Sequence, residues 1–474
     1  MKKLQIWGWF ISAFLKKHKK ILFVGISLGI IFAIFTIWVL PYIPRPNPVK
    51  RVGIVGQYQS QNMPEFITSK IGQGLTSILD DGQPAPALVE EWKVLDEGCE
   101  NEEDKGCTYI FTLRDNLFWQ DGTPVTTQSL NYSFKDVETK VIDDKTVQFT
   151  LKSPFTPFPT LLSEPALKKG YIGTGEYKLR KVKERSGYLE SVILEGPKDT
   201  YVVKFYPSIT TIKTAFMLGE VDEMINLFKN PFEFEDLWNE SVEVMSTTNT
   251  NQYIALFLNM DDPLFYSETD QSGRKNFRQA LAYATVKPTD SSRVYGPISN
   301  TCWAYNPDLK PYNYDPQRAR ELLEKSQGGG SVNSVSLRLS TTQAFLPQAE
   351  EIKRNWEETL GIKVEVQVIN TVPENFQVLL ASQEIPPDPD QYSLWHSTQT
   401  KRFTHYQSPR VDKLLEVARQ EQDPEKREEY YYDFQKFFVE ESPVIFISYP
   451  QTYTVKRKSV IKPITQALLQ LGRN

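Results

Sequence analysis

Hydrophobic positions recur with two different spacings in the region around residue 350, one typical of a strand and one typical of a helix. Val335, Leu337 and Leu339 alternate with polar neighbours, which is the period of a half-buried strand. Apolar residues then follow at helical spacing from Phe345 to Leu360, glycine stands at 361, and alternation resumes over 362–368. Strand, helix and strand in this order predict a βαβ unit, and hence a parallel sheet.

The same periods predict further elements on both sides of this unit. Residues 92–94 and 109–113 form a predicted pair of strands, and 147–151 a third. Thr127 is predicted to cap a short helix with Leu130 and Phe134 on its apolar side. Glycine at 219 is predicted to end a helix that includes 215–218, and two further helices begin at the Asp-Pro pairs 315–316 and 423–424.

A continuous apolar run stands before all of these elements. The twenty residues from Ile21 to Leu40 carry no charge, and lysines occupy 16, 17, 19 and 20. A helix of this length spans about 30 Å, the thickness of a bilayer core, and lysines favour the cytoplasmic side. We therefore expect a basic and aromatic cytoplasmic arm over 1–20, a transmembrane anchor over 21–40 and a proline-rich spacer over 41–49. A cleavable signal peptide is the alternative.

Charge and length narrow the class of the remaining chain. The whole chain has a net charge of −5, of which residues 1–40 contribute six lysines and no acid, so 41–474 carry about −11. This balance argues against a nucleic-acid partner. About 430 residues are too many for one compact core and favour two lobes.

Few residues in this sequence suggest metal or catalytic chemistry. The three histidines do not cluster, and no phosphate-binding loop or nucleophile elbow is present, so we expect no cofactor, no metal and no enzyme activity. Cys99 and Cys107 flank a short acidic loop, and we weigh a disulfide between them equally against two free thiols. Cys302 is then left over and is predicted to be buried.

Several blocks stand in one order from about Gly72 to Pro450. They occupy 74–75, 86–92, 109–125, 173–177, 277–284, 314–316, 388–392, 411–415, 423–427 and 442–445. In sequence and order these blocks resemble the extracytoplasmic solute-binding proteins of peptide and nickel ABC importers, known as family 5. The resemblance covers most of the chain beyond residue 50.

The resemblance implies an α/β fold of the two-lobed periplasmic-binding-protein type (class II, with an extra subdomain) behind one N-terminal transmembrane helix. Lobe I with the subdomain would occupy 50–254, completed by 440–474, and lobe II would occupy 255–439. The chain would cross between lobes near 255 and return near 440. A solute would bind in the cleft, and the lobes would close around it.

By the same resemblance, six residues are candidates for ligand binding. They are Tyr58, Asn259, Asp388, Asp390, Tyr392 and Trp395. Each also has a structural interpretation: core packing for the aromatic residues, and turn or helix capping for the aspartates. Where peptide-binding relatives carry an aspartate for the peptide amino group, this chain has Ile385, which cannot pair with an ammonium. Asp388 or Asp390 is a possible substitute.

These observations lead to one main functional hypothesis. The chain is expected to be a monomeric, membrane-anchored, extracytoplasmic solute-binding protein that passes a peptide or other small solute to an ABC permease. The alternative is a degenerate binding fold that serves as a scaffold or sensor for a membrane partner without transport. This alternative rests on Ile385 and on a shortened loop of 12 residues between Phe134 and Val147.

Overall fold

The computed structural model describes residues 16–20, 23–25, 27–35, 47–95, 107–233, 241–326, 335–400 and 403–458. The chain forms two compact units, one of residues 1–49 with 197–200 and one of residues 50–196 with 201–474. The first unit holds a helix over Lys16–Phe35 that is long and apolar enough to cross a membrane. It begins five residues before the predicted span. Residues 1–15 of the predicted arm over 1–20, residues 36–40 of the predicted anchor and most of the spacer lie outside the described residues.

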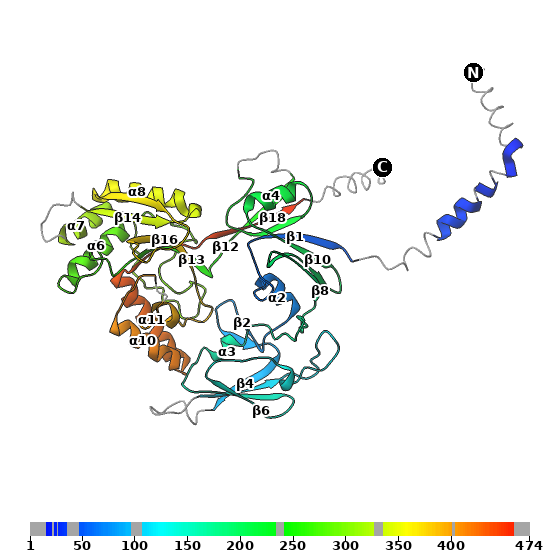
Figure 1. Cartoon of the computed structure of the whole chain (residues 1–474), viewed down its shortest axis with the longest axis horizontal. Coiled ribbons are helices and arrows are strands. Elements are labelled where there is room, and N and C mark those ends of the chain that lie inside the picture. The colour runs from blue at the N-terminus through cyan, green and yellow to red at the C-terminus, as the bar shows by residue number, and fades with distance from the viewer. Residues whose placement is uncertain are drawn as a thin grey trace, which may run out of the picture. The chain divides into compact units, whose positions relative to one another are not determined.

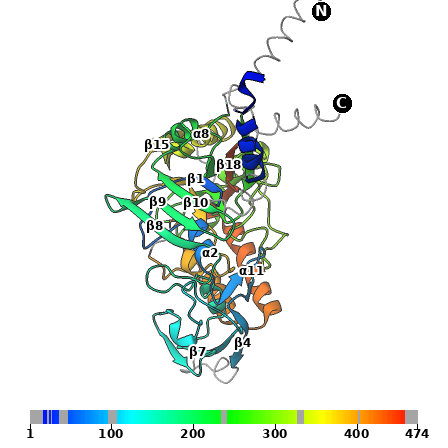
Figure 2. The ribbon, with the colours of Figure 1, turned by 90° about the vertical axis from the view of Figure 1, so that its right-hand side faces the viewer.

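The first large sheet of the second unit has seven strands in the order β12-β18-β11-β1-β10-β9-β8. Figure 2 shows β8, β9 and β10 side by side. Its strands and nearby helices are β1 (Val49–Val55), β8 (Lys178–Arg185), β9 (Tyr188–Glu195), β10 (Thr200–Tyr206), β11 (Glu223–Leu227), β12 (Val242–Thr248), β18 (Gln451–Arg457), α2 (Glu65–Ile71) and α4 (Ile209–Met217). The chain turns away just after α4 at Gly219, which has a φ of +77°, so the predicted end of this helix is confirmed.

A smaller antiparallel sheet is inserted between β1 and β8. It has the order β4-β5-β7-β6, and a two-stranded ribbon β2-β3 precedes it. The elements are β2 (Thr76–Ile78), β3 (Pro84–Pro86), β4 (Val89–Leu95), β5 (Thr108–Leu113), β6 (Val137–Val141), β7 (Thr146–Leu151) and α3 (Phe158–Leu161). Trp92 is paired with Phe111 and Phe111 with Val147, so the three predicted strands are confirmed.

The predicted helix after Thr127 is wrong. One 3-10 turn, Thr127–Ser129, stands there, and its N-cap is Thr126. The turn ends because Leu130 is already extended, with a φ of −75° and a ψ of 136°. Leu130 and Phe134 do pack on the core of the four-stranded sheet, but from an irregular segment. Their apolar spacing reflects contact with this sheet, not a shared helix face.

The second large sheet has five strands in the order β15-β14-β16-β13-β17. Its strands and the helix between two of them are β13 (Gln252–Leu258), β14 (Ser336–Thr341), β15 (Lys363–Val368), β16 (Val378–Glu384), β17 (Val444–Ser448) and α8 (Leu346–Leu360). β14 and β15 are parallel, with α8 between them in the chain and Gly361 in the left-handed conformation after it. The predicted βαβ unit is therefore confirmed, and Figure 1 shows α8 beside β14.

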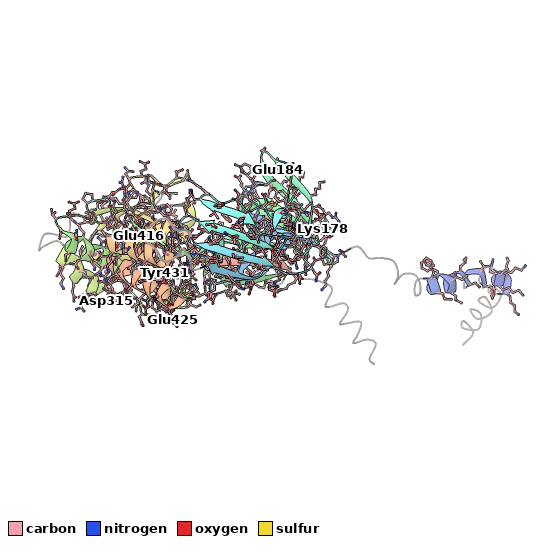
Figure 3. The ribbon with its side chains drawn as sticks, turned by 90° about the horizontal axis from the view of Figure 1, so that it is seen from below. Lys178, Glu184, Asp315, Glu416, Glu425 and Tyr431 are labelled. Carbon is pink, nitrogen blue, oxygen red and sulfur yellow. The ribbon has the colours of Figure 1, made fainter. Side chains whose placement is uncertain are left out.

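The remaining helices share one hydrophobic core with this second sheet, and Figure 1 labels all of them except α9. They are α6 (Gln271–Ala284), α7 (Pro316–Ser326), α9 (Tyr392–Trp395), α10 (Pro409–Gln420) and α11 (Pro424–Glu441). The carboxylates of Asp315 and Asp423 accept hydrogen bonds from backbone N–H groups in the first turns of α7 and α11, so both predicted helix starts are confirmed. Figure 3 shows Asp315, Glu416, Glu425 and Tyr431 on one side and Lys178 and Glu184 of the first sheet on the other.

The chain passes between the two large sheets twice. It leaves the first sheet between β12 and β13, at 249–251, and returns between β17 and β18, at 449–450. The first passage lies close to the predicted crossing. The second lies about ten residues after the predicted return, because β17 still pairs with β13. The predicted lobe bounds themselves stay predictions.

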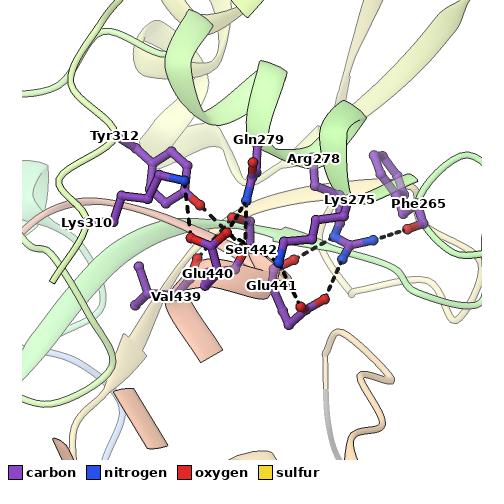
Figure 4. A network of polar contacts seen from close by, with 10 residues as sticks. All are labelled: Phe265, Lys275, Arg278, Gln279, Lys310, Tyr312, Val439, Glu440, Glu441 and Ser442. Carbon is purple, nitrogen blue, oxygen red and sulfur yellow. Dashed lines mark hydrogen bonds and ion pairs between the residues drawn. The ribbon is translucent and has the colours of Figure 1, made fainter. Parts of the chain in front are cut away.

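A polar network fixes the end of α11, just before β17 (Figure 4). The carboxylate of Glu440 contacts the ammonium groups of Lys310 at 3.1 Å and Lys275 at 3.3 Å. The buried guanidinium of Arg278 donates to the carbonyl oxygen of Glu441 at 2.8 Å. These contacts join α11 to α6, and so position β17.

The network predicts a dependence of stability on pH. Burial raises the pKa of Glu440, but Lys310 and Lys275 outweigh this and hold the pKa below its usual range. A lowered folded-state pKa contributes stability above the unfolded pKa, and this contribution is lost over the acidic interval below the ordinary glutamate pKa of about 4.3. We expect the difference in melting temperature between wild type and Glu440→Gln to shrink over that interval. The exposed Glu429→Gln on the same helix is the control, and an unchanged Glu440→Gln difference would contradict the assignment.

Candidate functional site

The inserted sheet and its ribbon directly contact α10 and the loops that connect the helices of the second sheet. The backbone N–H of Trp303 donates to the carbonyl oxygen of Asp81 at 3.0 Å, in the turn between β2 and β3. Thr156, which follows β7, donates its backbone N–H to the carbonyl oxygen of Arg419 at 2.9 Å and its hydroxyl to that of Glu421 at 2.8 Å. Both contacts join the inserted sheet and its ribbon to the part of the second unit that contains the second large sheet.

Beside the Thr156 contact lies a pocket of ≈ 540 Å³. One wall comes from the inserted sheet and α3, and the other from α9 and α10. The lining residues are Phe134, Lys135, Asp136, Val137, Leu151, Lys152, Ser153, Pro154, Phe155, Phe158, Leu161, Tyr392, Glu416, Arg419 and Gln420. A pocket of this size, with several aromatic side chains and a few polar groups, is typical of a small-molecule site.

Arg419 is the polar centre of the second wall. Its guanidinium lies 4.0 Å from the ring centroid of Tyr392 and 5.0 Å from that of Phe155, and it donates to the carboxylate of Asp390 at 2.8 Å. Tyr392 also stacks on His396, with 4.0 Å between the ring centroids. Among the described residues, Tyr392 is the one of the six predicted ligand residues that lines the pocket. Asp390 does not line it but pairs with Arg419, which does.

Asp388 forms a second ion pair, away from the pocket lining. Its carboxylate accepts from the guanidinium of Arg427 at 2.6 Å, and both side chains are less than a tenth exposed. Burial raises the pKa of Asp388, and Arg427 opposes this rise. The Asp388 carboxylate also accepts the backbone N–H of Asp390 at 2.9 Å. Asp388 is thus placed as an internal partner of α11.

The other three predicted residues are held by the core. Tyr58 packs against Phe205, with ring centroids 5.4 Å apart. Asn259 is buried after β13, where its side-chain amide donates to the carbonyl oxygen of Phe376 at 2.8 Å. Trp395 is buried between Phe257 and Phe438 and does not line the pocket. Their positions fit the structural interpretation, and a role in ligand binding stays a prediction for each.

The cysteines stand apart from this pocket. Cys107 lies fully buried just before β5 and is disulfide-bonded. Cys99 lies outside the described residues, so its assignment as the partner stays a prediction. Cys302 is a free, partly buried cysteine, and burial raises its pKa to about 12. A thiol protonated at neutral pH is a poor nucleophile. Across the described ranges, no group of three or more His, Cys, Asp or Glu side chains is placed to hold a metal ion.

Residues 83–405 match the sequence model of the bacterial extracellular solute-binding proteins, family 5 (middle region). This match covers more than half of the chain. The chain belongs to this family. As a member of the solute-binding proteins of family 5, it is not an enzyme.

Known relatives of this family 5 protein align with it over most of its length. It is 22% identical to the dipeptide-binding protein DppE of Bacillus subtilis, over 91% of this chain and 94% of that protein. It is similar in structure to NikZ of Campylobacter jejuni in complex with Ni(L-His), with a TM-score of 0.69, 20% identity and coverage of 87% of this chain and 95% of that one. The substrate-binding protein CtaP of Listeria monocytogenes gives a TM-score of 0.71 at 18% identity, over 87% and 94%. These likenesses confirm the periplasmic-binding-protein fold.

Several residues of the site were not predicted from sequence. Phe155 and Arg419 line the pocket, and Arg427 neutralises Asp388. Each lies in a segment whose local pattern indicates only a loop or an amphipathic helix. Their roles depend on contacts such as that of Thr156 with Glu421, two residues that stand 265 positions apart in the sequence.

Proposed function

We propose that this family 5 protein captures a small solute in the pocket beside Thr156 and delivers it to an ABC permease. The supporting observation is the pocket itself. It lies where the inserted sheet meets α9 and α10, and both of these parts line it. Closing or opening the contact at Thr156 would change the pocket, so solute binding and relative motion of the two parts would be coupled. DppE is named for binding dipeptides, which makes a peptide one candidate solute.

We further propose that the helix over Lys16–Phe35 is an uncleaved anchor with the rest of the chain outside the cytoplasm. The lysines before the apolar run and the absence of a small-x-small pattern after it support this orientation. The protein would then be a monomer tethered close to its permease.

The scaffold alternative is favoured by one specific observation. Asp388 and Asp390, the predicted substitutes for a peptide-binding aspartate, are both paired with arginines of the chain itself. A protein that touches a membrane partner without taking up solute would not need a free carboxylate. The two proposals differ in whether a solute stabilises the native state.

Thermal unfolding of the full-length chain in detergent tests solute capture. Peptides, amines, sugars and metal chelates would be screened, since binding to the native state raises the melting temperature. We expect at least one solute to do so in the wild type. Phe155→Ala should weaken its binding about tenfold, because it removes one of the two partly exposed phenylalanine rings of the pocket wall.

Phe437→Ala is the matched control for this variant. Phe437 is also a half-buried phenylalanine, but it lies on α11 under Arg410 and away from the pocket lining. It should leave solute binding unchanged. Absence of any stabilising solute, or equal weakening by both variants, would contradict solute capture in this pocket.

A further inference from the structure

We infer that the solute taken by this pocket carries an aromatic or branched apolar group and no free amino group, as in an N-acylated peptide or an aromatic acid. This inference rests on the proposed function and names the class of solute for that same pocket. Two observations support it: the aromatic side chains that line the pocket, and the lining carboxylates that already have partners.

Aromatic rings supply much of the lining. The partly exposed rings are those of Phe134 and Phe155, on the side of the inserted sheet, and Tyr392 of α9, whereas Phe158 is almost fully buried behind them. Phe134 packs edge-on against the buried Phe158, with centroids 5.5 Å apart, so its ring is supported by the core of the inserted sheet. A planar or branched apolar group buries area against such rings at little cost in ordering.

The carboxylates at the pocket already have cationic or imidazole partners. Asp136 pairs with Lys152, and Glu416 contacts the imidazole of His396 at 3.3 Å. Behind the lining, Asp390 pairs with Arg419. An ammonium group of a solute would therefore have to compete with these partners for the same carboxylates.

The aromatic faces do not replace the missing carboxylate. The guanidinium of Arg419 already lies over Tyr392 and near Phe155, where a solute ammonium could otherwise form a cation–π contact. A second cation at this place would be repelled by the first. A carboxylate, an acyl carbonyl or an aromatic ring is instead compatible with Arg419 and with Lys135 at the rim.

Paired peptides that differ in one group test this inference. Binding of acetyl-Phe-Phe-Ala, Phe-Phe-Ala and acetyl-Ala-Ala-Ala to the full-length chain in detergent would be measured by calorimetry. We expect acetyl-Phe-Phe-Ala to bind at least about tenfold more tightly than either of the other two. Equal or tighter binding of Phe-Phe-Ala, or equal binding of acetyl-Ala-Ala-Ala, would overturn the inference.

A charge variant tests the reason for the preference. Lys152→Met leaves Asp136 without its lysine at the pocket wall, and both side chains are exposed enough for the variant to fold. We expect the preference for the acetylated peptide to fall at least about threefold. Lys145→Met removes the equivalent exposed partner of Asp115 outside the lining and should leave the preference unchanged. An unchanged preference in Lys152→Met would overturn the charge argument.

The outcome also separates this inference from the proposed function. If sugars, amines or chelates stabilise the protein and no acetylated aromatic peptide binds, the solute class is wrong while solute capture stands. If nothing in either experiment binds, solute capture itself is wrong.

Discussion

Arg427→Met is expected to lower the free energy of unfolding by about 3–5 kcal/mol, since it leaves the buried carboxylate of Asp388 without a counter-charge. The guanidinium also donates to the carbonyl oxygen of Ala418 at 3.1 Å and to the hydroxyl of Tyr431 at 3.3 Å, so its loss leaves two further acceptors without this donor. Methionine keeps most of the side-chain volume and removes the charge. Urea denaturation of the full-length chain would measure the change.

Two further variants separate the charge effect from other causes. Adding Asp388→Asn to Arg427→Met removes the unpaired charge and should recover a large part of the stability. Arg51 makes a two-fold contact with Asp222 at 2.7 Å, but both side chains are more than a third exposed. Arg51→Met should therefore cost less than about 1 kcal/mol. A similar cost for Arg51→Met and Arg427→Met would contradict the role of burial.

Gly82→Ala is expected to weaken solute binding about 5- to 150-fold. A Cβ atom at this position would lie 2.3 Å from the carbonyl oxygen of Pro387, on the opposite side of the contact that includes Asp81 and Trp303. Such an overlap in a packed contact costs about 1–3 kcal/mol, which corresponds to that range of affinity. The closed arrangement of the two parts would lose population, and the solute would bind less tightly. Calorimetry with a solute found in the screen would measure the loss.

Gly122→Ala is a close control for this variant. Gly122 has a φ of +84°, against +86° for Gly82, so both variants place alanine in the same strained backbone conformation. A Cβ atom at Gly122 meets nothing within 4 Å. Gly122→Ala should therefore keep the affinity of the wild type. If both variants lose affinity equally, backbone strain and not the contact with Pro387 is responsible.

Elements with a strong local period could be predicted from sequence. The βαβ unit over 336–368 was predictable because alternation, helical spacing and Gly361 all point to the same structure. The Asp-Pro helix starts were predictable because capping is a contact between near neighbours. The helix after Thr127 was predicted wrongly, since apolar spacing there reflects packing on a sheet formed by distant strands.

The candidate site could be predicted only in part. The segment 388–395 was singled out by resemblance, and Tyr392 from this segment does line the pocket. The pairing of Asp388 with Arg427 and of Asp390 with Arg419 could not be predicted, because nothing near either arginine in the sequence marks a carboxylate partner. These two pairs change the chemistry of the segment from acidic to neutral.

The distance between the two sides of the pocket tests the central claim most directly. Spin labels at the exposed positions Lys140 on β6 and Glu425 on α11 of the full-length chain would report it, with and without a solute that raises the melting temperature. Solute capture between the two parts predicts a broad distribution that narrows to one short distance when the solute binds. An identical distribution in both conditions, with the solute demonstrably bound, would contradict it.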